Sequence, residues 1–167
     1  MKKMLIVVYS WSNGNTRRIA DMLKDASGAD LEQIETVKPY PEDYNTTVNQ
    51  GQREVTAGYK PAIKALKHNL QDYDVIAVGT PTWWYTMAPA VKTFLESNDF
   101  SGKTVIPFMT NGGWPGHVIR DMKKAVKNAD VKFELQVKFD STGGSTMETS
   151  EKEVKDWTER VTKFLNA

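Results

Sequence analysis

The chain has 167 residues, a net charge of +1 and 40% hydrophobic residues, which is the size and balance of one folded domain. Its 22 basic and 21 acidic side chains argue against a dedicated nucleic-acid binder, because such proteins carry a basic excess. The absence of cysteine excludes disulfides, thiol catalysis and thiolate metal sites, and two histidines are few for a metal centre. The first apolar run, 4–9, is too short for a signal peptide, and no run is long enough to span a membrane. We therefore expect a cytoplasmic protein that binds neither membranes nor nucleic acids.

Strand and helix patterns then alternate along the chain. Continuous apolar runs are typical of strands that are covered on both faces, and apolar residues at helical spacing indicate the helices between them. The last helix begins with Ser150 and Glu153 at capping-box spacing. The expected strands are 4–9, 31–37, 75–79, 104–109 and 131–139, and the expected helices are 16–26, 88–97, 118–126 and 150–165.

This alternation predicts an α/β protein, a three-layer α/β/α sandwich around a five-stranded parallel sheet in the order 2-1-3-4-5. We expect a single domain over 1–167, with an irregular excursion at about 38–61. A loop of that length without secondary structure is uncommon, so we expect a short helix near Asn45 to Val55 within it. With its tyrosines, the excursion is a candidate lid or wall beside a ligand.

Ligands of such sheets bind at the carboxyl ends of the strands, where the strand order reverses. The loops that follow the first, third and fourth strands meet there, and they hold four of the five tryptophans. The loops comprise Ser10, Trp11, Ser12, Asn13, Gly14, Asn15 and Thr16; Thr80, Pro81, Thr82, Trp83, Trp84 and Tyr85; and Thr110, Asn111, Gly112, Gly113, Trp114, Pro115 and Gly116.

The first loop has the chemistry of an anion site. It supplies hydroxyl and amide side chains, and Gly14 allows successive backbone N–H groups to converge before a helix N-terminus. Arg17 and Arg18 oppose the dipole of that helix, and a bound dianion would offset their cost. A polar turn that only caps the helix would give the same pattern. The chain contains neither a Walker loop nor a G-x-G-x-x-G fingerprint.

The other two loops suit a flat ligand. Trp83, Trp84 and Tyr85 follow one another after a buried strand, although we expect at least one of these rings to fold back onto the core. The glycines around Trp114 allow the backbone to approach an aromatic edge and to offer N–H donors to it. A phosphate cradle that faces aromatic and glycine walls indicates a ligand with a phosphate tail and a planar ring, and FMN matches this description.

Taken together, these segments resemble the flavodoxin-like family over essentially the whole chain. Tyr9 to Thr16 resembles the family's phosphate loop, with Asn13 as one extra residue, while Gly79 to Trp84 and Thr110 to Gly113 resemble the two isoalloxazine loops of its small bacterial branch. The resemblance implies noncovalent FMN and redox chemistry carried by the flavin, with no catalytic side chain. It implies that Ser10 and residues 12–16 hold the phosphate, and that Trp11, residues 81–85 and 110–114 and Gly116 also belong to the cofactor site.

Charge bears on the kind of redox protein. Electron-transfer flavodoxins are typically acidic, which lowers the flavin potential, whereas these three loops contain no Asp or Glu. The residues after the third strand also lack the glycine whose peptide commonly flips to stabilise a one-electron-reduced flavin. We therefore expect an NAD(P)H oxidoreductase of the quinone reductase type, a monomer or a homodimer, which takes electrons from NAD(P)H or a redox partner. The alternatives are a one-electron carrier that serves protein partners and a flavin-free interaction domain.

Overall fold

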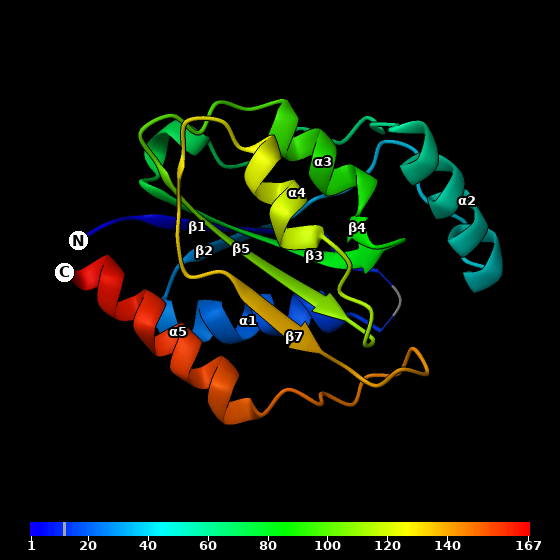
Figure 1. Cartoon of the computed structure of the whole chain (residues 1–167). Helices are drawn as coiled ribbons and strands as arrows, with labels where there is room; N and C mark the ends of the chain where they lie inside the picture. Colours follow the sequence, from blue (N-terminus) through cyan, green and yellow to red (C-terminus); the bar gives the residue numbers. More distant parts are fainter. Residues whose placement is uncertain (12) are drawn as a thin grey trace.

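The computed structural model describes residues 1–11 and 13–167, in which a mostly parallel sheet lies between two layers of helices (Figure 1). The strands are β1 (Met4–Val8), β2 (Asp30–Gln33), β3 (Val75–Trp83), β4 (Thr86–Met87), β5 (Thr104–Asn111), β6 (Asp130–Val131) and β7 (Leu135–Lys138). The helices are α1 (Asn15–Ser27), α2 (Tyr44–Ala57), α3 (Pro89–Glu96), α4 (Val118–Ala125) and α5 (Glu151–Asn166), with a 3₁₀ turn at Leu70–Asp72.

The strand order is β2-β1-β3-β5-β6, with β7 beside β5 and the short β4 antiparallel to β3. With β6 and β7 occupying one position, this is the predicted order 2-1-3-4-5. The single strand expected at 131–139 is wrong, because the chain leaves the ladder between β6 and β7, where Phe133 has φ 55°. The edge strand β2 is also shorter than expected, since it ends at Gln33 and Thr36 makes a lone bridge to Ile63.

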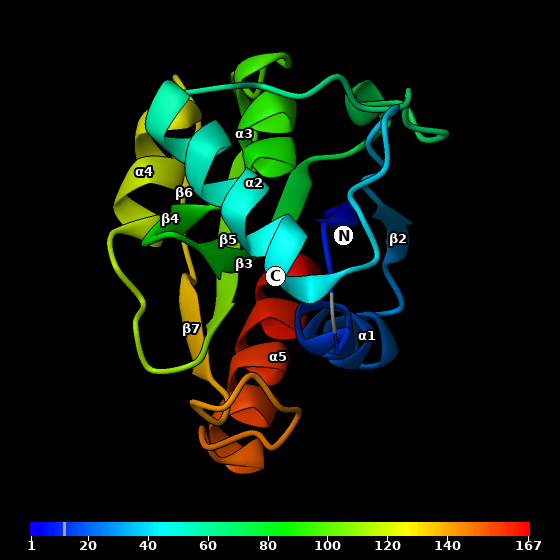
Figure 2. The same cartoon turned by 90° about the vertical axis from the view of Figure 1, so that its right-hand side faces the viewer.

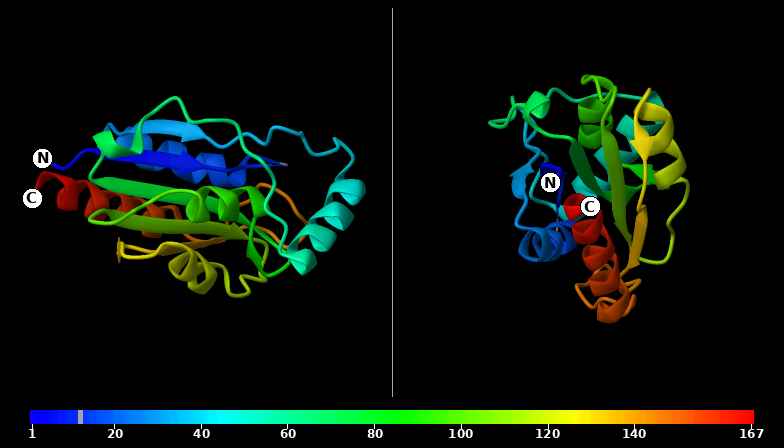
Figure 3. Two further views of the ribbon diagram at one scale, coloured as in Figure 1. Left: turned by 90° about the horizontal axis from the view of Figure 1, so that it is seen from above. Right: turned by 90° about the vertical axis from the view of Figure 1, so that its left-hand side faces the viewer.

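Helices α1 and α5 cover one face of the sheet, and α3 and α4 cover the other (Figures 1 and 3). Side chains of β1 alternate between the two cores: Leu5 and Val7 pack under α3 and α4, while Ile6 and Val8 pack against α1 and α5. This burial on both sides explains why the strands are continuous apolar runs. The termini lie together at the amino edge of the sheet, where Lys2 N donates to the carbonyl of Leu165 at 2.8 Å.

The excursion at 38–61 contains the expected helix, α2, which lies beyond the carboxyl ends of the strands (Figures 1 and 2). Asp43 caps it by accepting a hydrogen bond from Thr46 N at 2.8 Å, and Gly58 ends it with φ 65°. Its buried face consists of Thr47, Gly51 and Glu54. Within residues 1–11 and 13–167, no helix combines the length and the apolar character that crossing a membrane requires.

Candidate functional site

The loop after β1 leads into the N-terminus of α1. Gly14 occupies the N-cap with φ 71°, a conformation that residues with a Cβ rarely adopt. Arg17 N donates to Ser10 Oγ at 3.3 Å and Arg18 N donates to the Gly14 carbonyl at 2.9 Å. Within the described residues, no group accepts a hydrogen bond from the backbone N–H of Gly14, Asn15 or Thr16. The turn therefore offers these donors to a ligand.

Side chains of this loop tie it to two distant segments. The hydroxyls of Thr16 and Thr110 are 2.8 Å apart and buried, which joins the start of α1 to the end of β5. The amides of Asn13 and Asn15 donate to the carbonyls of Gly143 and Gly144, the latter at 3.0 Å. Both asparagine side chains, expected to hold a phosphate, are thus engaged with the segment after β7.

The segment 140–146 is organised by one carboxylate. Asp140 accepts hydrogen bonds from the Thr142 hydroxyl at 2.6 Å, from Gly144 N at 2.9 Å and from Thr146 N at 3.1 Å. These bonds lower the pKa of Asp140 to about 2. A Cβ on Gly144 would lie 2.5 Å from a carboxylate oxygen of Asp140, so a larger residue there would displace this carboxylate.

The second expected loop is largely a β-hairpin. β3 continues through Trp83, pairing with β5 as far as Pro81 opposite Thr110, and then turns back into β4. The two turn residues, Trp84 and Tyr85, have φ 50° and 68°, positions at which two-residue hairpins usually place Asn and Gly. The prediction of a loop after Gly79 is therefore wrong, because the apolar run ends before the strand does.

The third loop packs against this hairpin. Thr110 and Asn111 still belong to β5, and Asn111 Oδ1 accepts a hydrogen bond from Gly113 N at 2.7 Å. His117 N donates to the carbonyl of Tyr85 at 2.8 Å. A Cβ on Gly116 would lie 2.2 Å from the same carbonyl oxygen, so only glycine permits this approach.

Trp83 is the ring that folds back onto the core, as expected. It meets Tyr9, Trp11 and Tyr40 edge-on, with ring centroids 5.9, 6.2 and 5.0 Å away. α2 crosses it at Gly51, where a Cβ would be 3.1 Å from the indole. By contrast, Trp84, Tyr85 and Trp114 are 38%, 52% and 59% exposed. The hairpin and the third loop therefore combine one partly buried indole with three exposed rings.

Behind Trp83 lies a buried carboxylate. Glu54 of α2 accepts hydrogen bonds from the Tyr40 hydroxyl at 2.6 Å and from Gln50 Nε2 at 2.8 Å. Burial, and then the bond to Glu54, raises the pKa of Tyr40. Tyr40 therefore stays a neutral hydrogen-bond donor, which fixes α2 against the aromatic cluster.

These segments enclose a cavity of about 290 Å³ at the carboxyl edge of the sheet. Of the expected site residues, its walls contain Trp11, Asn13, Asn15, Thr16, Pro81, Thr82, Trp83, Trp84, Thr110, Asn111 and Gly112. Ser10, Gly14, Tyr85, Gly113, Trp114 and Gly116 lie outside this lining, and Ser12 lies outside the described residues.

Two groups of lining residues were not among the expected site residues. The first is Tyr44, Thr47, Val48 and Gly51 on α2, so the excursion forms a wall, as expected of it in general terms. The second is Phe139, Asp140, Gly143 and Gly144. A signal for this second group was the glycine pair after the last strand, whose carboxyl end meets the same edge of the sheet. Because Asp140 lines it, the cavity contains an acidic group, whereas the three expected loops contain none.

Comparison with known proteins agrees with this architecture. A family model described as flavodoxin matches residues 3–161. A protein from Bacteroides eggerthii assigned as a flavoprotein is 31% identical, with a TM-score of 0.76 over 96% of this chain and 98% of that one. A Lactobacillus acidophilus flavoprotein solved in complex with FMN is 22% identical, with a TM-score of 0.69 over 81% and 93%. A flavodoxin from the domain Archaea is 17% identical, with a TM-score of 0.56 over 98% and 99%. No curated protein matches the chain.

Proposed function

Because the chain belongs to the flavodoxin family, we propose that its cavity binds FMN noncovalently and that the protein passes electrons from NAD(P)H or a redox partner to a small acceptor such as a quinone. The observation that carries the proposal is the presence, in one cavity, of a helix N-terminus with unused N–H donors and a set of aromatic walls. The helix N-terminus suits a phosphate, and the aromatic walls suit a planar ring.

The residues present fit this cofactor. The N–H groups of Gly14, Asn15 and Thr16, with the Thr16 hydroxyl, would hold the phosphate. Trp11, Trp83, Trp84 and Tyr44 supply aromatic surface to the cavity, against which a ring would pack and from which water would be excluded. The volume of about 290 Å³ is near the lower end of the range for small-molecule sites, ~300–1,000 Å³.

FMN, when bound, supplies the transfer of one or two electrons. The role of the protein is to bind and orient FMN and to set the electrostatic potential around it. Asp140 lines the cavity and stays ionised down to low pH, so it opposes the build-up of negative charge there. The other lining residues carry no formal charge, which supports a less negative potential than that of a strongly acidic carrier.

The first test is a titration of the purified protein with FMN and with riboflavin, followed by absorbance and tryptophan fluorescence. We expect strong quenching by FMN and weaker binding of riboflavin, which lacks the phosphate. Thr16→Val should reduce this preference, whereas the exposed control Thr56→Val should retain it. If FMN leaves the tryptophans unperturbed, the protein is not an FMN carrier or enzyme. If the Thr16 variant keeps the full preference, the phosphate assignment is wrong.

The second test addresses the reaction. The FMN-loaded protein should oxidise NADH or NADPH in the presence of a quinone, and a redox titration should follow a single two-electron transition. Two well-separated one-electron transitions without nicotinamide oxidation would instead support the carrier function.

A further inference from the structure

A second hollow lies on the α3–α4 side of the sheet, and its volume of about 840 Å³ is larger than that of the cofactor cavity. Its walls include Lys92, Leu95 and Glu96 of α3, Asp121 and Lys124 of α4, and Thr86 of β4. We propose that this α3–α4 groove binds the adenosine diphosphate part of the nicotinamide dinucleotide that donates electrons. This proposal rests on the proposed function, because it says where the electron donor of that function binds.

The groove adjoins the cofactor cavity through α2. Thr47 and Gly51 of this helix line the cavity, while Glu54, Val55 and Gly58 line the groove. Since these residues recur at intervals of three or four, one face of α2 covers both hollows. Figure 2 shows α2 passing in front of the strand ends, from the side of α1 to the side of α3 and α4.

The hairpin forms a second shared wall. Trp83 and Trp84 of its first half line the cavity, and Thr86 and Met87 of its second half line the groove. A ligand that lies along the groove therefore has one end beside the hairpin, next to the cavity. This is the arrangement that a dinucleotide needs, because its nicotinamide must reach the flavin while the rest of the molecule binds elsewhere.

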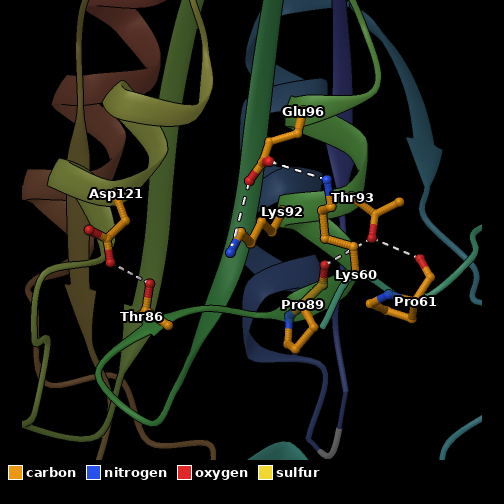
Figure 4. Close-up of polar contacts among 8 residues, drawn as sticks. All are labelled: Lys60, Pro61, Thr86, Pro89, Lys92, Thr93, Glu96 and Asp121. Carbon is orange, nitrogen blue, oxygen red and sulfur yellow. Dashed lines mark hydrogen bonds and ion pairs between the residues drawn. The ribbon is translucent and has the colours of Figure 1, made fainter. Parts of the chain in front are cut away.

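The acidic side chains of α3 and α4 in the groove are already engaged (Figure 4). Glu96 meets Lys60 at 3.4 Å and Lys92 at 4.0 Å. Asp121 accepts a hydrogen bond from the Thr86 hydroxyl at 2.5 Å and contacts His117 Nδ1. These carboxylates are neutralised or hydrogen-bonded, so they oppose an anionic ligand less than their number suggests.

Two further carboxylates of the groove are engaged in the same way. Glu54 is held by Tyr40 and Gln50, as described above, and Asp99 accepts hydrogen bonds from Ser101 N at 2.9 Å and from the Ser101 hydroxyl at 2.6 Å.

Two ammonium groups of the groove remain without such partners. Lys124, in the last turn of α4, and Lys127, two residues after the helix, are exposed and form no ion pair with any described residue. Both are therefore free to meet a diphosphate. Ser97, Asn98 and Asn128 line the same groove and supply hydrogen-bonding groups, and Tyr59, which is 51% exposed, offers an aromatic face. Phosphates, sugar hydroxyls and a planar base are the three chemical parts of adenosine diphosphate.

The test uses ADP-ribose, which lacks the nicotinamide and cannot transfer electrons. Calorimetric titration of the FMN-loaded protein should show saturable binding that weakens as the salt concentration rises. The double variant Lys124→Glu/Lys127→Glu should weaken this binding by about tenfold or more. The control Lys155→Glu/Lys163→Glu makes the same change in net charge on exposed positions of α5, and it should bind ADP-ribose like the wild type.

Steady-state kinetics supply a second readout. The Lys124/Lys127 variant should raise KM for NADH or NADPH with little change in kcat, because it removes binding of a part of the substrate that does not react. The absence of ADP-ribose binding in a protein that binds FMN would overturn the proposal, as would equal weakening in the α5 control. The two proposals fail separately, because ADP-ribose binding is measured without electron transfer and FMN binding without ADP-ribose.

Discussion

At the scale of single residues, one buried pair of hydroxyls connects the start of α1 to the end of β5. Thr16 and Thr110 are 1% and 4% exposed, and their oxygens are 2.8 Å apart. Replacing either one by valine leaves the other hydroxyl buried with its bond broken. We expect Thr16→Val and Thr110→Val each to lower the free energy of unfolding by about 1–3 kcal/mol.

The double variant tests this cause directly. With both hydroxyls replaced by methyl groups, neither side chain leaves a buried polar group without a partner. The free energy of unfolding of Thr16→Val/Thr110→Val should therefore fall by less than the sum of the two single decreases. Urea denaturation of the four proteins of this cycle gives the coupling energy. Strictly additive losses would show that the hydroxyls do not stabilise each other.

At the hairpin turn, we expect a substitution to raise the free energy of unfolding instead of lowering it. Tyr85 has φ 68°, so its backbone is strained, and about half of its surface is exposed. Asparagine adopts this conformation more readily, and we expect Tyr85→Asn to raise the free energy of unfolding by about 1 kcal/mol. Tyr59→Asn is the control, since Tyr59 is 51% exposed and has no positive φ. Equal effects of the two substitutions in urea denaturation would argue that the turn is not strained.

These residues also show what a sequence can indicate about a site. Gly14 and Thr16 could be placed at a helix start, because glycine and a hydroxyl before an amphipathic run are local signals. The partners of Asn13 and Asn15 could not be predicted, because Gly143 and Gly144 are 130 and 129 residues away along the chain. An amide can bond a phosphate or a carbonyl equally well, and only the tertiary structure decides between them.

At the scale of elements, apolar periodicity located the strands but not their ends. β3 extends four residues beyond Gly79 because Thr80, Pro81 and Thr82 find partners on β5 and β4, which no local pattern reports. In the same way, β6 and β7 both pair with β5, although Phe133 interrupts them. α2 could be anticipated because a long structureless loop is uncommon, but its place over the cavity follows only from packing.

The segment after β7 gives a prediction about pH. Asp140 has a folded pKa of about 2, below the ~3.9 of an unfolded aspartate. Its hydrogen bonds therefore stabilise the protein fully above about pH 4, and this contribution is lost as the pH falls through about 2. We expect the stability difference between wild type and Asp140→Asn to be constant near neutral pH and to shrink between about pH 4 and pH 2.

Urea denaturation as a function of pH measures this difference, and the exposed Asp25→Asn provides the control. A difference that persists unchanged to pH 2 would mean that the carboxylate does not hold the turn. In addition, since Asp140 lines the cavity, its variant should bind FMN with altered affinity even where its stability matches that of the wild type.

At the scale of the whole molecule, the cavity wall is assembled from segments that lie far apart in sequence. The loop after β1, helix α2, the β3–β4 hairpin, the end of β5 and the turn after β7 each contribute side chains. Three of these segments follow central strands of the sheet, which explains why the loop positions alone indicated where a ligand binds. The remaining two are held by contacts with the first three, through Gly51 at Trp83 and through Asn15 at Gly144.

Because the cavity is assembled from distant segments, it exists only in the folded chain, and FMN binding should stabilise the fold. A ligand at one hundred times its Kd adds about 2.7 kcal/mol to the free energy of unfolding. For a chain of this length, each kcal/mol raises Tm by about 2–4 °C, so we expect a shift of about 5–11 °C in a thermal melt. Riboflavin at the same concentration should give a smaller shift, and Thr16→Val should reduce the shift caused by FMN. A melt in which FMN leaves Tm unchanged while its absorbance reports binding would mean that FMN binds the unfolded chain as well as the folded one, and the five-segment cavity would not be its site.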